Sequence, residues 1–208
     1  MPTPLTPQPD RPPHVGIPDG LPTPGRFTHL HPDDGACLME TASMLATGSF
    51  TDSPPGTHPV LAALTRAVND TVSDGTRRAL WPLAADLADA NPADRAYGPL
   101  LVGTVVDAAR RVRPASRRLK RHSTACHRRA RRLAHAPTWQ VSPRIADLLW
   151  WHGPGHRHLE HALHVLVTTP DADQRLSELL HQAVAQARRT TNAASTGSAH
   201  RTAPSPSR

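Results

Sequence analysis

Five ionisable or nucleophilic side chains between residues 37 and 70 have the chemistry of a reactive site. They are Cys37, Glu40, Asp52, His58 and Asp70. A histidine beside carboxylates can exchange protons near neutral pH, and the same groups can also bind a metal ion. Cys37 and Glu40 lie one helical turn apart, so we expect both to face the same groove. The five residues therefore form a candidate acid–base or metal pocket.

A purely structural interpretation of the same residues is simpler, and we favour it. Glu40 and Asp70 would be exposed or would pair with arginines such as Arg66. Asp52 and Thr57 would cap turns, while His58 would bond the backbone near a helix N-terminus, where N–H groups would lower its pKa. The chain contains no glycine-rich phosphate loop, no G-x-S-x-G and no C-x-x-C motif.

Histidines are concentrated a second time near the C-terminal end. Five of them lie within thirteen residues, namely His152, His156, His158, His161 and His164. The spacing matches no familiar zinc motif, because Arg157 stands where H-x-x-E-H requires its first histidine. On a helical wheel, His158, His161 and His164 diverge by roughly 60° at each step. His158 and His161 are thus weak metal candidates, structural or exposed histidines are favoured, and no cofactor is indicated.

The strongest feature of the sequence is a segment of one charge sign. No acidic residue lies between Asp107 and Asp147, whereas twelve lysines and arginines do. Subtracting these twelve charges from the net charge of +7 leaves −5 for the rest of the chain. The protein therefore combines a mildly acidic body with one strongly cationic element.

Residues 114–136 are expected to form a basic amphipathic helix. Leu119, Cys126, Ala130 and Leu133 cluster on a narrow apolar stripe at helical spacing. The candidate polyanion-binding residues lie around the rest of the helix: Arg117, Lys120, Arg121, Arg128, Arg129, Arg131 and Arg132. Guanidinium groups bind phosphates through charge and paired hydrogen bonds. The partner would be nucleic acid or an acidic protein; alternatively, the face is solvated and neutralises the acidic body.

Other segments must position these groups, and all of them show helical periodicity. Helices are expected from Asp33 to Thr47, from Thr57 to about Val72, from Ser73 onward with a kink at Pro82, and over 92–113. Ser142-Pro143 should begin another, with Ile145, Leu148 and Leu149 inward, and further helices follow Gly155 and span 171–189. No segment alternates as a strand would. The expected fold is all-α, a bundle of six to eight helices.

The two ends of the chain differ in composition from the middle. Residues 1–30 are rich in proline and residues 190–208 in Ser, Thr and Ala, so we expect both to be disordered. The N-terminal helical region would then span 31–113 and the C-terminal helical region 137–189. No apolar run approaches the ~20 residues of a membrane span. With no secretory signal and two cysteines, we expect a cytoplasmic protein of undetermined oligomeric state.

Several stretches of the N-terminal region carry a recognisable pattern. They are CLMETASMLATG, FTDSPPGTHPVLAAL, RAVND and SDGTRRALWPLAADL, about 60 residues together. In these stretches the chain resembles an uncharacterised bacterial family. The resemblance implies no activity, because none is assigned to that family. Many of its members carry His-Pro-x-Cys after the aspartate, where this chain has Ser53-Pro-Pro-Gly.

Three functional hypotheses follow. The first is a non-enzymatic binding or regulatory protein that uses the arginine face. The second is a small enzyme or metal protein with its site at Cys37, Glu40, His58 and Asp70. The third is a helical interaction module that docks a partner through the leucine stripe of 171–189. The sequence leaves open whether the protein is an enzyme.

Overall fold

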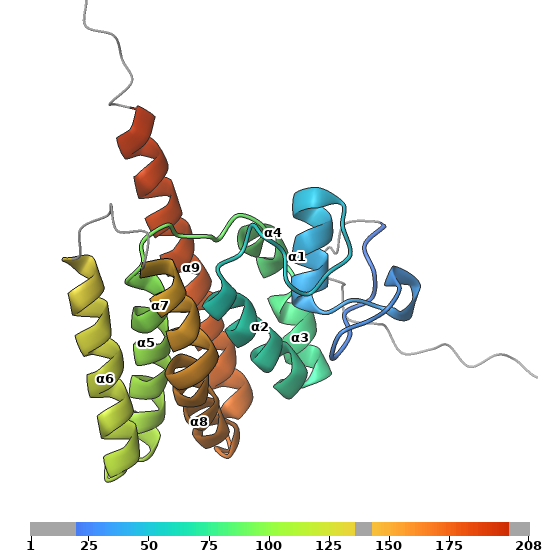
Figure 1. Ribbon diagram of the computed structural model, residues 1–208. Helices are drawn as coiled ribbons and strands as arrows, with labels where there is room; N and C mark the ends of the chain where they lie inside the picture. Colours follow the sequence, from blue (N-terminus) through green and yellow to red (C-terminus); the bar gives the residue numbers. More distant parts are fainter. Residues whose placement is uncertain (1–19, 136–142, 200–208) are drawn as a thin grey trace, which may run out of the picture.

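The fold is all-α, as expected, in a computed structural model that describes residues 20–135 and 143–199 (Figure 1). Within those two ranges every regular element is a helix, apart from one isolated bridge between Pro24 and Ala36. None of the helices there is both long and apolar enough to cross a membrane. The side chains of Pro143, Arg144 and residues 194–199 lie outside the description.

The helices follow one another with short connections. Their bounds are η1 Pro32–Asp34, α1 Leu38–Thr47, α2 Pro59–Thr71, α3 Asp74–Leu80, α4 Leu83–Leu87, α5 Tyr97–Val112, α6 Arg117–Ala134, α7 Pro143–Trp150, η2 Trp151–Gly155, α8 His156–Val167 and α9 Ala172–Ala199. The break between α3 and α4 falls at Pro82, the expected kink. Gly48 ends α1 with a φ of 72°, a left-handed conformation that glycine adopts without steric cost.

Three expected boundaries are wrong. The helix expected from Asp33 begins at Leu38, because the preceding residues form the short 3₁₀ turn η1. Residues 20–30, expected to be disordered, pack onto the fold: the Gly25 N–H donates to the Ala36 carbonyl at 2.7 Å. The last helix continues ten residues past position 189, to Ala199, so helix replaces the first part of the expected tail.

Helix α5 lies in the middle of the bundle and contacts α2, α6, α8 and α9. Leu101, Val102, Val105, Val106 and Ala109 on this helix are fully buried. Each fully buried leucine or valine contributes roughly 1.5–3 kcal/mol relative to an exposed one. In Figure 1, α6 lies beyond α5 at one edge of the molecule, while α1, α3 and α4 lie at the other.

The apolar stripe of α9 is part of the core. Leu176, Leu180 and Ala187 are fully buried, and Ala183 and Val184 nearly so. The Ala183 carbonyl accepts a hydrogen bond from the buried Tyr97 hydroxyl of α5. This stripe is therefore unavailable to a partner, which removes the surface on which the interaction-module hypothesis relied.

Helix α7 packs by a different face from the one expected. Ile145, Leu148 and Leu149 are 65%, 57% and 67% exposed, so the expectation that they point inward is wrong. The face that docks carries Asp147 and Trp150, whose ion pairs and large ring anchor the helix. Two faces of this short helix are amphipathic, and the one with stronger specific contacts packs.

Truncating one leucine on each helix tests this assignment. We expect Leu180→Ala to lower the free energy of unfolding by about 3–5 kcal/mol, because it leaves a cavity in the core. Leu149→Ala is the matched control on α7 and should change it by less than about 0.5 kcal/mol, as exposed sites do. Chemical denaturation of both variants measures the difference, and equal losses would contradict the packing of α7 and α9.

Candidate functional site

The five residues proposed as one acid–base or metal pocket do not share a site. His58 caps the N-terminus of α2, and Asp70 lies in its last turn. Twelve residues of helix separate them by roughly 18 Å at 1.5 Å per residue. Among the residues that the structure describes, no group of three or more His, Cys, Asp or Glu side chains is arranged to hold a metal ion. The single-pocket hypothesis is therefore wrong.

Three of the five instead hold one short segment, Phe27–His29, which we term the N-terminal clasp. Asp70 Oδ1 accepts from the Phe27 N–H at 2.8 Å, and Asp52 Oδ2 accepts from the Thr28 hydroxyl at 3.2 Å. Glu40 Oε1 accepts from the His29 N–H at 2.7 Å. Three consecutive residues are thus each fixed by a different carboxylate, so these acids have a structural task.

Glu40 is the deepest of these carboxylates. Its side chain is completely buried, so the expectation of an exposed or arginine-paired glutamate is wrong. Besides the His29 backbone, it accepts from His29 Nδ1 at 2.9 Å and from the Cys37 N–H at 2.7 Å. In return, the Cys37 sulfur accepts from the Glu40 N–H, which completes a capping box at the start of α1. All of these partners compensate for the lost hydration of the carboxylate.

The thiol of Cys37 is not prepared for nucleophilic chemistry. Burial raises its pKa to about 12, and the neighbouring Glu40 carboxylate adds to the effect. A cysteine reacts as its thiolate, which this environment disfavours. Cys37 therefore serves as a helix cap, and no item of its surroundings favours catalysis.

The family-like motifs of the sequence coincide with this clasp. Asn69 of the RAVND stretch accepts from the Leu38 N–H of the CLMETAS stretch at 3.2 Å. Its amide donates to the Gly25 carbonyl at 3.0 Å. Phe27 has a φ of 61°, which costs an L-residue about 1 kcal/mol or more, and the bond to Asp70 compensates for that cost. The motif residues thus join α1, α2 and the N-terminal segment.

Removing the Glu40 carboxylate should weaken the whole N-terminal region. Glu40→Ala leaves buried N–H donors unpaired, so we expect the free energy of unfolding to fall by about 3 kcal/mol or more. Glu178→Ala, an exposed glutamate of α9, is the control and should have little effect. Thermal and urea unfolding measure both. A loss for Glu40→Ala no larger than for the control would show that the clasp carries no stability.

His58 has a different environment from the carboxylates. It caps α2 in place of the expected Thr57, and its Nδ1 accepts from the Val60 N–H at 3.2 Å. The Thr57 hydroxyl instead donates to the Leu87 carbonyl. The imidazole packs edge-on against Tyr97, with ring centroids 4.8 Å apart. Burial lowers the pKa of His58 to about 4, so the ring is neutral at neutral pH.

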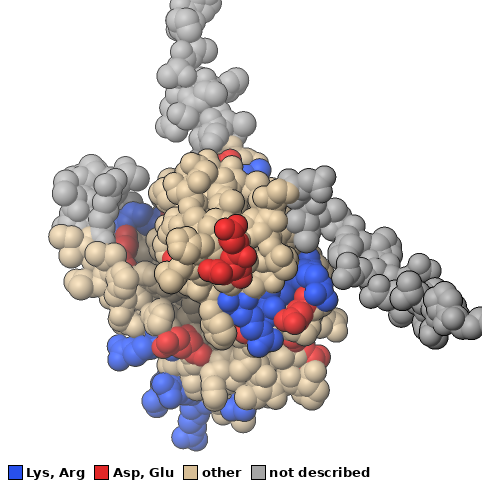
Figure 2. All heavy atoms as spheres, turned by 90° about the vertical axis from the view of Figure 1, so that its right-hand side faces the viewer, with Lys and Arg blue, Asp and Glu red and all other residues tan. Residues whose placement is uncertain are grey.

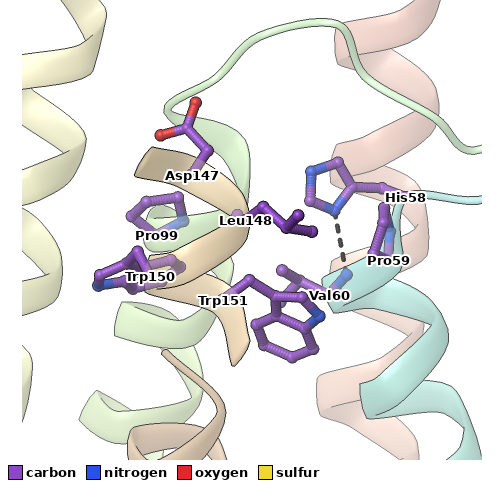
Figure 3. Close-up of a pocket in the computed structure, with 9 residues that line it drawn as sticks. His58, Pro59, Val60, Pro99, Asp147, Leu148, Trp150 and Trp151 are labelled. Atoms are coloured by element: carbon purple, nitrogen blue, oxygen red, sulfur yellow. Dashed lines mark hydrogen bonds between the residues drawn. The ribbon is translucent and has the colours of Figure 1, made fainter. Parts of the chain in front are cut away.

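A cavity of about 230 Å³ lies beside His58 (Figure 3). We term it the α2–α5–α7 pocket. Its walls come from the first turns of α2 and α5 and from α7 with η2: His58, Pro59, Val60, Gly98, Pro99, Asp147, Leu148, Trp150 and Trp151. A Cβ on Gly98 would lie 3.2 Å from His58 Cε1 and from Val60 Cγ2, so glycine permits this close approach. The adjacent tryptophans, in a chain with 3% aromatics, were the sequence signal that our prediction missed.

Asp147 connects this pocket to the basic helix. Its two oxygens accept from Arg95 Nε at 2.7 Å and from Arg129 Nη2 at 2.6 Å. The Arg129 guanidinium also lies 5.1 Å from the centroid of the Trp150 ring, in cation–π geometry. Arg129 is therefore engaged inside the molecule, and its inclusion among the polyanion-binding residues is wrong.

The other six predicted basic residues of α6 are exposed: Arg117, Lys120, Arg121, Arg128, Arg131 and Arg132. We term them the α6 basic face. No acidic group in the described part of the chain lies within ion-pair distance of any of them. Four of them line a shallow, open hollow of about 500 Å³ with Thr124 and Ala125. Around α1 and α3, by contrast, acidic and basic side chains lie next to each other (Figure 2).

The opposite side of α6 packs as predicted, with Leu119, Cys126 and Ala130 buried against α5. A polar group that the sequence analysis missed accompanies this stripe. Asp107 of α5 accepts from Ser123 Oγ at 2.7 Å and from His127 Nε2 at 2.7 Å. Burial raises the pKa of Asp107, but bonds from His127, Ser123 and Arg110 outweigh it and hold that pKa below its usual range. This charged anchor fixes the rotation of α6 about its own axis.

The weak metal candidates His158 and His161 meet a histidine of α6. The His158 ring stacks on His122 with centroids 4.0 Å apart, and His161 meets His122 edge-on at 5.4 Å. Burial, the neighbouring histidines and Arg118 lower the pKa of His122 to about 4. Burial also lowers the pKa of His158. These rings pack as neutral aromatic groups between α6 and α8, a contact that their divergence on the helical wheel did not indicate.

Comparison of the chain with protein families, curated proteins and solved structures finds no match. The resemblance to an uncharacterised bacterial family therefore stays a prediction. Function must be argued from the geometry of the α6 basic face and of the α2–α5–α7 pocket.

The environment of His58 has a measurable consequence for acid stability. Its pKa is near 6.5 when unfolded and about 4 when folded, so the unfolded chain binds more protons between these values. Stability contributed by neutral His58 is complete above about pH 6.5 and is lost as the pH falls, by about 2 kcal/mol at pH ~5. His58→Asn keeps an N-cap acceptor and should remove this contribution.

The measurement is the free energy of unfolding of wild type and variant at about pH 7 and about pH 5. The wild type should lose about 2 kcal/mol more than His58→Asn over this interval. His181→Asn changes an exposed histidine of α9 and should follow the wild type. Parallel losses in all three proteins would contradict a buried, neutral His58.

Proposed function

We propose that this protein binds the phosphate backbone of nucleic acid through the α6 basic face. The observation that supports the proposal is a row of exposed arginines with no acidic partner in the described residues. Charge that served only to neutralise the acidic body would be expected to pair with it. Arg129 does so with Asp147, and the remaining cations of the face do not.

The position of α6 favours contact with a large partner. The helix lies at an edge of the bundle, and its contacts are concentrated on α5, so most of its surface faces outward (Figure 1). Its Asp107 anchor and buried stripe fix which face points outward. A prearranged face loses less conformational entropy on binding than a disordered basic tail. Eighteen helical residues extend for roughly 27 Å, enough for several successive phosphates.

Recognition would depend on charge and shape. Arginine binds phosphate oxygens in a bidentate manner, whereas sequence is read mainly through contacts to base edges. No aromatic side chain lies in α6 to stack on an unpaired base. We therefore infer a preference for duplexes and weak sequence specificity. The same proposal places the protein in the cytoplasm, consistent with free, buried Cys37 and Cys126.

The experiment measures binding of the full chain to labelled generic DNA and RNA duplexes at about 50 and about 200 mM salt. We expect affinity to fall steeply with salt, because bound phosphates release counterions. The triple variant Arg121→Gln, Arg128→Gln, Arg132→Gln should bind at least roughly tenfold more weakly at low salt. Its logarithmic salt slope should be smaller by about one for each lost phosphate contact.

A charge-matched control separates the α6 face from net charge. Arg78, Arg157 and Arg189 are exposed on α3, α8 and α9. Changing these three to Gln lowers the net charge equally and should leave binding nearly unchanged. Equal losses in both triple variants, or no binding at low salt, would contradict the proposal. Competition by polyglutamate as effective as that by duplex would indicate an acidic protein as the partner instead.

A further inference from the structure

We propose that the α2–α5–α7 pocket binds a small, uncharged, planar molecule that carries a hydrogen-bond acceptor. This proposal is independent of the α6 basic face. It rests on the shape of the cavity, on the flat groups that line it and on the single donor that His58 offers there (Figure 3).

The size of the pocket sets the size of the ligand. An apolar protein cavity of about 150 Å³ accommodates benzene. The 230 Å³ of this pocket therefore suit one or two fused rings. Larger cofactors such as nucleotides would not be enclosed, because typical sites for them begin at about 300 Å³.

The walls favour a flat ligand. Trp150 and Trp151 come from the end of α7 and the start of η2, while Pro59 and Pro99 come from the first turns of α2 and α5. Indole and pyrrolidine rings are rigid, so they lose little entropy when a ligand binds. Aromatic pairs gain about 0.5–1.5 kcal/mol beyond the burial of their area. A planar aromatic molecule uses these walls better than a branched aliphatic one.

The donor in the pocket is the His58 Nε2–H. Because Nδ1 accepts the Val60 N–H, the neutral ring must carry its proton on Nε2. The structure records no protein partner for Nε2 among the described residues, and the imidazole edge faces Leu148 across the cavity in Figure 3. A ligand that offers an acceptor would satisfy this group.

The other polar group of the pocket does not attract a charged ligand. Asp147 is already paired with Arg95 and with Arg129. Its negative charge is compensated, and its oxygens are occupied by those guanidinium groups. A cation would find no unpaired carboxylate there, and an anion would meet the Asp147 charge at close range. The pocket therefore selects neutral ligands.

The test compares quinoline with naphthalene, which has the same shape but no acceptor nitrogen. Binding of each probe to the full chain at neutral pH is followed by ligand-observed NMR. We expect both to bind and quinoline to bind roughly threefold to tenfold more tightly, the usual net effect of one hydrogen bond. Absence of binding overturns the proposal, and equal affinities overturn the requirement for an acceptor.

Two variants locate the site. Leu148 lines the pocket and is 57% exposed, so Leu148→Trp should fill the cavity without disturbing the core and should abolish binding. Leu149→Trp is the matched control, because its neighbour is 67% exposed and lies outside the pocket lining. Equal effects of the two variants would overturn the assignment of the site.

A third variant tests the donor. His58→Asn preserves the helix cap but removes Nε2–H, so the advantage of quinoline over naphthalene should disappear. Circular dichroism and thermal unfolding confirm that the variant is folded. If quinoline keeps its advantage in this folded variant, His58 is not the donor and the proposal fails.

Discussion

The burial of α5 on almost every side is the constraint around which this structure is organised. A helix whose exposed positions are few must be covered by neighbours, and α2, α6, α8 and α9 all pack on it. Its first turn, with Gly98 and Pro99, forms part of the pocket wall, and Asp107 near its other end anchors α6. Both candidate functional surfaces are thus held by one buried helix.

Charged groups divide into those that stabilise the fold and those that remain available. Glu40, Asp52 and Asp70 are engaged with residues 27–29, while Asp147 pairs with two arginines. A buried carboxylate is tolerated because every such group has hydrogen-bonded partners. What remains unpaired in the described residues is positive and lies on α6, which is why the electrostatic interest of the molecule concentrates there.

Helix α7 connects the two candidate surfaces physically. Its Asp147 and Trp150 hold Arg129 of α6, and the same two residues, with Leu148, line the pocket. The aliphatic side chains of α7 stay exposed because its polar and aromatic face makes the stronger contacts. A pattern of leucines alone could not distinguish these two faces, since both repeat at helical spacing.

The sequence by itself determined the helical class, most helix boundaries, and the segregation of charge onto one amphipathic helix. These are local properties: periodicity, caps and breakers act within a few residues, as at Gly48 and Pro82. Only the tertiary structure decided that His58 and Asp70 lie at opposite ends of α2, that His122 stacks on His158, and that Arg129 turns inward. Sites depend on contacts between residues far apart in the chain, and spacing along one helix does not encode them.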